Sequence, residues 1–336
     1  MQVQEHVPLK DHTTFRLGGE ARYFIDCVDE QEVREAVLFA QEKELPLFVL
    51  GGGSNTVFTD KGFPGVVLRI SIRGVQVIQG IGDEAIVLVC AGENWDEFVS
   101  QATEEGWYGL ENLSLIPGTV GGAPVQNIGA YGTEVSTYIE SVSVFDTKEN
   151  KKKNFSNNDC HFAYRTSVFK EEQGRYIILS VIFRLKKIFT PNLSYKDVAQ
   201  ILEGKEVTPE IVRETIIAIR TRKLPDWKAL GTAGSFFKNP EVTKEEVDTL
   251  LAKYPEVPVY PYGDRFKISA GYLIEHVAHM KGEKRGGVGV YDKHALVLVN
   301  YGEGTYEELQ ALVEGIQEKV KEKTGITLTP EVNVVI

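Results

Sequence analysis

Three consecutive glycines, Gly51–Gly53, end the apolar run LPLFVL and constrain the fold of this chain more than any other feature. A glycine loses more conformational freedom on folding than any other residue, so a run of glycines indicates positive φ or a group close to the backbone. A strand that runs into GGGSN exposes backbone N–H groups beside small polar side chains, which suits an anion such as pyrophosphate. A plain turn after a strand is the alternative, because such turns are common. The segment is neither a Walker A loop nor a G-x-G-x-x-G turn.

A second glycine-bearing segment, LENLSLIPGTVGGAPVQNIGAYG at residues 110–132, is too long and too apolar for an ordinary loop. Loops of this length inside a domain are usually functional. Thr119, Gln126 and Asn127 add polar side chains to its bare backbone. Two such segments suit an extended dinucleotide better than a single phosphate, and a pair of glycine-rich hairpins is the alternative.

Length and charge narrow the classes of function. A chain of 336 residues is expected to form two or three domains. Its net charge of -11 argues against a nucleic-acid surface, so glycine loops and a few lysines or arginines would have to hold any anionic ligand. The sequence has no long apolar run and no secretory pattern at its start, so we expect a cytoplasmic protein without a membrane partner. The three cysteines form neither a disulfide framework nor a zinc spacing, and we expect no metal.

Hydrophobic periodicity and capping residues predict the main elements. Helices are expected at residues 29–44, 94–106, 208–223, 245–255, 270–277 and 305–325. Strands are expected at residues 45–50, 65–70, 74–79, 85–92, 140–147, 175–187, 294–300 and 326–336. The polar stretch NKKKNFSNND is expected to be a hairpin tip with its lysines in a solvated turn, and a domain boundary is expected near Thr208.

Five ordered motifs are similar to those of a known enzyme family. They are GGGSN, the segment 110–132, YRTSVFK, GTAGSFFKNP and a PEV near the end. In this order and at these spacings they resemble the UDP-N-acetylenolpyruvoylglucosamine reductases (MurB), over essentially the whole chain. The stretch NLSYKDV resembles the type I form of that family, in which a tyrosine-bearing loop folds over the substrate. Tyr195 would be that tyrosine.

The resemblance implies an α+β fold. An FAD-binding module of the vanillyl-alcohol-oxidase (PCMH) type would occupy two α+β subdomains, and a C-terminal α+β domain would bind substrate. The expected boundaries are residues 1–73 with 325–336 for the first subdomain, 74–207 for the second and 208–324 for the substrate domain. In that family the final strand returns to the first domain.

The resemblance also implies the reaction. NADPH would reduce a bound FAD, and the enolpyruvyl group of UDP-N-acetylglucosamine enolpyruvate would be reduced to the lactyl ether of UDP-N-acetylmuramate, for peptidoglycan synthesis, cell wall biogenesis, cell shape and cell division. Ser235 matches the family's proton donor, Arg165 its active-site arginine, and Glu331 a carboxylate near the substrate carboxylate. A serine hydroxyl is a weak acid, so it needs a strongly basic intermediate. Asn333 stands where relatives usually carry a basic residue.

Further positions match by motif. The cofactor residues would be Gly51, Gly52, Gly53, Ser54, Asn55, Pro117, Gly118, Thr119, Gly121, Gly122, Asn127, Gly129, Ala130, Tyr131 and Gly132. The substrate residues would be Tyr195, Arg220, Lys223, Asn239 and His294, with Lys223 binding the diphosphate. The FAD should be non-covalent, because the glycine segments hold no histidine or cysteine to tether the ring.

Each role has a plainer structural alternative. Ser235 could be a turn residue, Arg165 a surface ion-pair residue and Glu331 a solvated strand residue. Arg220 and Lys223 could complement the dipole of a helix end, and His294 could make a structural hydrogen bond. A flavin oxidase or dehydrogenase would share both glycine segments, and a nucleotide-binding regulator would be colourless when purified. A monomer is expected.

Overall fold

The computed structural model describes the backbone of residues 1–336 and the side chains of residues 1–80 and 82–336. The chain divides into two units, each described here by itself. Unit 1 consists of Met1–Val7, Ala21–Gly52 and Pro64–Arg222, and unit 2 consists of Pro8–Glu20, Gly53–Phe63 and Lys223–Ile336. The division passes through the glycine run, between Gly52 and Gly53. The expected three-part division stays a prediction.

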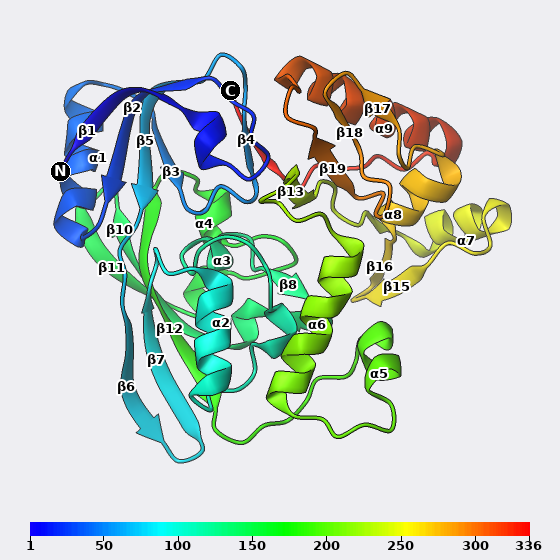
Figure 1. Cartoon of the computed structure of the whole chain (residues 1–336), viewed down its shortest axis with the longest axis horizontal. Helices are drawn as coiled ribbons and strands as arrows, with labels where there is room; N and C mark the ends of the chain where they lie inside the picture. The colour runs from blue at the N-terminus through cyan, green and yellow to red at the C-terminus, as the bar shows by residue number, and fades with distance from the viewer. The chain divides into compact units, whose positions relative to one another are not determined.

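Unit 1 contains two large sheets (Figure 1). The four-stranded sheet has the order β1 (Val3–Pro8), β2 (Glu20–Cys27), β5 (Phe63–Ile70) and β3 (Leu47–Leu50), with β3 and β5 parallel. The five-stranded antiparallel sheet has the order β11 (Lys151–Ser156), β10 (Ile139–Asp146), β12 (Tyr176–Lys186), β7 (Glu84–Cys90) and β6 (Val75–Ile81). A small pair joins β8 (Gly129–Ala130) to β9 (Thr133–Glu134) within the second glycine segment.

The helices of unit 1 begin where the sequence supplies caps. They are α1 (Glu30–Glu42), α2 (Trp95–Glu104), α3 (Gly122–Val125), α4 (Val168–Glu171), α5 (Lys196–Leu202) and α6 (Pro209–Lys223), whose last residue falls in unit 2. Asp29 and Asn94 accept hydrogen bonds from the third residue of α1 and α2, which satisfies amides that a helix start leaves open. Both helices bury one apolar face in a core that the two large sheets share. The central aromatic side chains of this core are Trp95, Phe98 and Phe183.

The predicted hairpin tip at NKKKNFSNND is wrong. Its lysines belong to β11, which pairs with β10 at the edge of the five-stranded sheet. Lys153 reaches the buried carboxylate of Asp146 at 2.7 Å, and Lys151 and Lys152 pair with exposed glutamates. Lysines on an edge strand keep that edge from pairing with another chain. The polar run was therefore a strand whose charges have specific partners.

Asp146 is expected to contribute stability that depends on pH. Its side chain is 0% exposed. Burial opposes the ionisation of Asp146. Hydrogen bonds from two cations and two backbone amides outweigh burial and lower its pKa to about 2. The donors are the side chains of Lys153 and Arg175 and the amides of Lys148 and Glu149. Because the folded pKa lies below the ordinary value of 3.8, this stability is present above about pH 4 and is lost as the pH falls toward 2.

We therefore expect Asp146→Asn to lower the free energy of unfolding by about 2 kcal/mol at pH 7 and by about half as much at pH 3. Urea unfolding at the two pH values measures both. Asp248→Asn, at an exposed carboxylate paired with Lys244, is the control and should cost less than about 0.5 kcal/mol at either pH. An Asp146→Asn cost that does not change between pH 7 and pH 3 would contradict the assignment.

Unit 2 is built on two antiparallel sheets and one parallel strand pair. The sheets have the orders β13 (Gly231–Ser235), β19 (Val297–Asn300), β18 (Val288–Val290), β17 (Lys284–Arg285), and β14 (Glu241–Val242), β16 (Arg265–Ile268), β15 (Val259–Tyr262). The last strand, β20 (Asn333–Val335), pairs in parallel with β4 (Thr56–Phe58). The helices are α7 (Lys244–Lys253), α8 (Ala270–Tyr272) and α9 (Tyr306–Thr324), and a π-helical turn at Leu273–Val277 follows α8.

Most predicted elements are confirmed, with changes at their ends. A capping box of Thr305 and Glu308 starts α9, which buries Leu309, Leu312 and Ile316. The strands predicted over residues 294–300 and 326–336 are shorter, because residues 294–296 form a turn and residues 326–332 are irregular. Within the described residues, no helix has both the length and the apolar character needed to cross a membrane.

Candidate functional site

The glycines that follow β3 have no space around them for a side chain. A Cβ on Gly51 would lie 2.8 Å from the hydroxyl oxygen of Thr119, and one on Gly52 would lie 2.7 Å from Cα of Gly118. Side-chain carbons do not approach backbone so closely, so the two glycine segments of unit 1 can meet only because these residues are glycine. Among the described residues, no hydrogen-bond acceptor faces the amides of Gly51 and Gly52.

Backbone hydrogen bonds hold the second glycine segment against the start of α2 and the residues before it. The amide of Trp95 donates to the carbonyl of Gly118, and the amides of Val120 and Gly121 donate to Glu93 and Ala91. Asn127 is 1% exposed, and both its side-chain nitrogen and its side-chain oxygen make hydrogen bonds within the protein. Its Nδ2 donates to Glu134 and to the carbonyl of Ala163, and its Oδ1 accepts from the amide of Ser136. Asn127 therefore shapes this segment through protein contacts.

Arg165 lies against the second glycine segment. Its Nη2 donates to the carbonyl of Gly129 at 2.8 Å, and its guanidinium lies over the ring of Tyr164. The backbone of Arg165 has φ 56°, which is uncommon for a residue with a side chain. Unit 1 thus brings the predicted active-site arginine onto the predicted cofactor segment.

Tyr131 connects three of the predicted positions. Its ring packs edge-on against the ring of Tyr195, with 5.0 Å between centroids. Tyr131 also makes a hydrogen bond with Arg220. Burial lowers the pKa of Arg220, and the interaction with Tyr131 raises it by a smaller amount. A cofactor candidate therefore contacts two substrate candidates, and Tyr195 itself remains 40% exposed.

One ion pair next to the glycine segment was missed. Arg213 of α6 donates to Asp96 of α2 at 2.7 Å, and the same carboxylate accepts from the amide of Leu115 at 2.6 Å. Arg213 and Arg220 are seven residues apart, so they lie on one face of α6. The seven-residue spacing could have indicated that Arg213 shares a face with Arg220. It could not have indicated Asp96 as the partner, because Asp96 is distant in the sequence.

In unit 2, Ser235 and Glu331 lie on neighbouring backbone segments. Ser235 ends β13 and is exposed. The next residue, Phe236, accepts a hydrogen bond from the amide of Glu331 at 2.8 Å, and Phe237 forms a bridge with Pro330. Two backbone segments that are far apart in the sequence, and that carry residues matched to the same reaction, therefore pair in unit 2.

Asn55 explains how the Glu331 segment is held without a basic residue at position 333. The Nδ2 of Asn55 donates to the carbonyl of Glu331 at 3.3 Å. The amide of Asn333 donates to the carbonyl of Asn55 at 3.0 Å, next to the β4–β20 pair. Backbone pairing and the Asn55 side chain thus position this segment. Gly53, also in unit 2, has φ 64°, and a Cβ there would lie 2.1 Å from the carbonyl of His12.

Asn239 and His294 both make structural hydrogen bonds. The Oδ1 of Asn239 accepts from the amide of Ala270, at the start of α8. The Nδ1 of His294 accepts from the amide of Leu296 at 3.3 Å, so Nε2 carries the proton of the neutral ring. Burial lowers the pKa of His294, and the positive charge of Lys223 lowers it further. The positive charge of Lys223 therefore acts on the imidazole of His294 within unit 2.

Removal of the Lys223 charge should raise the pKa of His294. We expect Lys223→Met to move it upward but to keep it below 6.5, because burial is the larger cause of the shift and remains. An NMR titration of the imidazole measures the change, with Lys244→Met as a control on an exposed lysine of the same unit. Equal His294 pKa values in wild type and Lys223→Met would show that the two groups do not interact.

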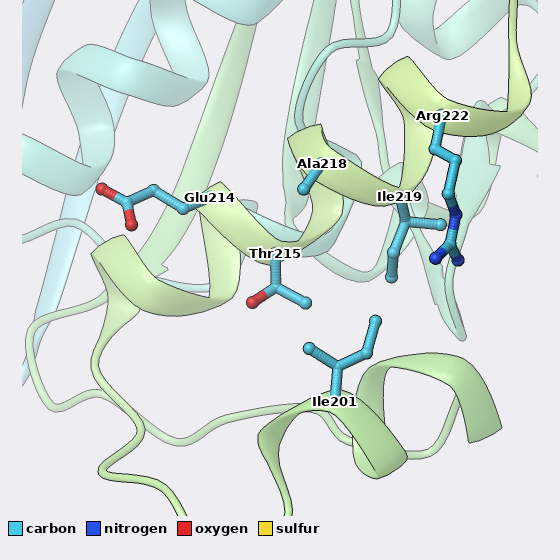
Figure 2. Close-up of a pocket in the computed structure, with 6 residues that line it drawn as sticks. All are labelled: Ile201, Glu214, Thr215, Ala218, Ile219 and Arg222. Carbon is cyan, nitrogen blue, oxygen red and sulfur yellow. The ribbon is translucent and has the colours of Figure 1, made fainter.

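A pocket of about 360 Å³ lies between α5 and α6. Figure 2 shows Ile201 of α5 pointing toward Thr215 and Ile219 of α6, with Glu214 and Arg222 at opposite ends. These α6 residues belong to a different face from Arg213 and Arg220. None of the predicted site residues lines this pocket. One face of α6 carries Arg213 and Arg220, which contact Asp96 and Tyr131, and another face contacts α5.

The residues of unit 1 fit an FAD at the glycine segments. The amides of Gly51 and Gly52, without acceptors among the described residues, offer donors to a diphosphate, and both glycines lack the side chain that would cover them. No group of three or more metal-ligating side chains is present among the described residues. Two backbone N–H donors of this kind suit the oxygens of a diphosphate.

Comparisons with known proteins agree with this arrangement. A family model described as "FAD binding domain" matches residues 21–150, and one described as "UDP-N-acetylenolpyruvoylglucosamine reductase, C-terminal domain" matches residues 226–335. The chain is 42% identical to the UDP-N-acetylenolpyruvoylglucosamine reductase of Chromobacterium violaceum, over 98% of each chain. It is 43% identical to the protein of the same name from Pseudomonas aeruginosa, over 99% of each.

Among solved structures, the chain is similar to the crystal structure of UDP-N-acetylenolpyruvylglucosamine reductase (MurB) from Thermus caldophilus. The TM-score is 0.72 at 25% identity, and the match covers 100% of both chains. Together with the two family models, this match confirms the predicted fold class, an FAD-binding module followed by a C-terminal α+β domain.

Proposed function

Because the chain belongs to the UDP-N-acetylenolpyruvoylglucosamine reductase family, we propose that it reduces the enolpyruvyl group of UDP-N-acetylglucosamine enolpyruvate to the lactyl ether. The product is UDP-N-acetylmuramate, a precursor of peptidoglycan. The enzyme is an FAD-dependent oxidoreductase with NADPH as co-substrate. The flavin is held without a covalent bond, since residues 49–55 and 110–132 contain no histidine or cysteine.

Reduction of the enolpyruvyl double bond requires one hydride and one proton on neighbouring carbons. When bound, FAD supplies the hydride chemistry, with NADPH as the source of the hydride. Ser235 delivers the proton from its hydroxyl to the carbon next to the substrate carboxylate. Arg165 stabilises the negative charge that develops on this carboxylate, and Glu331 acts beside the same group.

Other residues bind and orient the substrate. Lys223 binds the diphosphate, and the neutral His294 donates from Nε2 to an acceptor of the nucleotide sugar. Arg220 and Asn239 support binding, and Tyr195 closes over the diphosphate. The backbone of Gly51–Asn55 and Pro117–Gly132 holds the cofactor.

One observation supports this proposal most strongly. Unit 2 pairs the backbone next to Ser235 with that of Glu331 through the 2.8 Å hydrogen bond from the Glu331 amide to the Phe236 carbonyl. This pairing joins two segments that are far apart in the sequence, and this supports the assignment of Ser235 and Glu331 to one reaction.

The reaction is tested by mixing the purified yellow protein with NADPH and UDP-N-acetylglucosamine enolpyruvate, without oxygen. We expect one NADPH to be oxidised for each enolpyruvyl group consumed, and the product to gain two hydrogen atoms by mass spectrometry. In a parallel experiment with oxygen present, rapid reaction of the reduced flavin with oxygen, and none with the enolpyruvyl compound, would favour an oxidase instead. A colourless protein that takes up no FAD would refute both.

The three-part division and the cellular setting belong to the same proposal. Residues 1–73 with 325–336, residues 74–207 and residues 208–324 would be the three parts, and the parallel pairing of β20 with β4 supports the return of the chain end. We infer a monomer that works in the cytoplasm, where its nucleotide-sugar substrate is found. Light scattering after gel filtration tests the monomer.

A further inference from the structure

Two asparagines outside the predicted site join the Tyr195 loop to the second glycine segment. Asn112, in the turn Glu111–Leu113, is 2% exposed. Its Nδ2 donates to the carbonyl of Tyr131 at 2.8 Å and to the carbonyl of Asn192 at 3.0 Å. Both hydrogens of this buried amide group are therefore donated, one to the second glycine segment and one to the Tyr195 loop.

Asn192 completes the connection from the loop side. Its Nδ2 donates to the carbonyl of Gly132 and to the hydroxyl of Thr133, both at 3.0 Å. Its Oδ1 accepts from the amide and the hydroxyl of Ser194, at 3.1 and 2.7 Å. This side chain thus fixes the backbone just before Tyr195 to the backbone just after Tyr131.

Gly132 permits this close contact. A Cβ at Gly132 would lie 2.2 Å from the hydroxyl oxygen of Ser194, and its φ of 80° favours glycine. The neighbouring Tyr131 has φ 48°, a conformation that an L residue adopts when surrounding contacts impose it. The hydrogen bond from Asn112 to the Tyr131 carbonyl is one such contact.

The helix that follows Tyr195 is a weaker anchor. Tyr195 is the N-cap residue of α5, and its side chain makes no capping hydrogen bond. The short helix α5 packs on α6 through a small apolar cluster, next to the pocket of about 360 Å³ that Figure 2 shows. Because this pocket takes up part of the space between the two helices, α5 is held on α6 by only a small apolar cluster.

We propose that Asn112 and Asn192, the asparagine brace, are positioning residues that hold Tyr195 in place by tying its loop to residues 131–133 of the second glycine segment. The brace rests on the proposed function, because it acts on the substrate through Tyr195. It makes the order of the Tyr195 loop depend on the segment assigned to the cofactor. Neither asparagine needs to touch substrate or flavin.

Asn112→Asp tests the brace, because it replaces the donor group with an acceptor at constant size. In the holoenzyme we expect hydrogen exchange across residues 190–200 to become about tenfold faster, as the loss of one to two hydrogen bonds predicts. The KM for UDP-N-acetylglucosamine enolpyruvate should rise by a similar factor, while flavin reduction by NADPH stays unchanged. Asn192→Ala, at a less buried position, should give the same pattern.

Asn157→Asp is the matched control. Asn157 also donates two hydrogen bonds from Nδ2, to the carbonyls of Ser136 and Ile139, but it contacts neither the Tyr195 loop nor residues 131–133. Loop exchange or KM values in Asn112→Asp and Asn192→Ala equal to those of Asn157→Asp would overturn the brace. If the wild-type protein did not react with the enolpyruvyl substrate, the proposed function would fail, and loop exchange would still decide the brace.

Discussion

Ser235→Ala is expected to slow the reoxidation of the reduced flavin by the enolpyruvyl substrate by about 10²- to 10⁴-fold. Alanine removes the only atom of Ser235 that can give up a proton, and the side chain is exposed at the end of β13, so the change leaves no cavity. Flavin reduction by NADPH does not use this proton and should keep its rate. Stopped-flow measurement of the two half-reactions separates these effects.

Thr243→Ala is the control for loss of a hydroxyl from unit 2. Thr243 caps α7 in a capping box, so this variant should cost about 1 kcal/mol of stability and leave both half-reactions unchanged. If Ser235→Ala reoxidises with substrate at the wild-type rate, Ser235 is not the proton donor. If both half-reactions slow together in Ser235→Ala, the loss is in folding or in cofactor binding.

Gly52→Ala should weaken FAD binding by about tenfold to hundredfold. The added Cβ would lie 2.7 Å from Cα of Gly118 and 3.1 Å from its carbonyl carbon, and backbone cannot rotate away as a side chain can. Overpacking of this kind costs about 1–3 kcal/mol, and here it separates the two segments that we propose hold the cofactor. The flavin content of the purified protein and an FAD titration of the stripped protein measure the loss.

Gly315→Ala provides the comparison for the same substitution elsewhere. Gly315 lies inside α9, where a Cβ would come no closer than 3.4 Å to the side chain of Arg285. Alanine also favours a helix interior over glycine by about 1 kcal/mol, so FAD content should not fall. A Gly52→Ala protein with full FAD content and wild-type affinity would show that the contact with Gly118 is unrelated to cofactor binding.

Local sequence signals predicted the helices well. The caps at Asp29, Asn94 and Thr305 mark three helix starts, because a capping side chain and its amide are only three residues apart. The lysine run of β11 was mistaken for a turn because its strand pairing and the buried Asp146 lie elsewhere in the chain. Charge composition alone does not reveal such partners.

The candidate site was predictable as a set of motifs but not as a set of contacts. The resemblance of their motifs assigned separate roles to Ser235 and Glu331, but the pairing of their segments depends on backbone contacts between distant residues. The links of Asn112 to Asn192 and of Asp96 to Arg213 were missed for the same reason. Asparagines and ion pairs outside a motif carry no local signal of their partners.

The protein passes reducing equivalents from NADPH through FAD to an enolpyruvyl ether. The most direct test reduces the FAD-loaded enzyme with one equivalent of NADPH under anaerobic conditions and then adds UDP-N-acetylglucosamine enolpyruvate in a stopped-flow instrument. The account predicts that the oxidised flavin spectrum returns within the turnover time and that UDP-N-acetylmuramate forms in equal amount. A flavin that stays reduced in the presence of this substrate would contradict it.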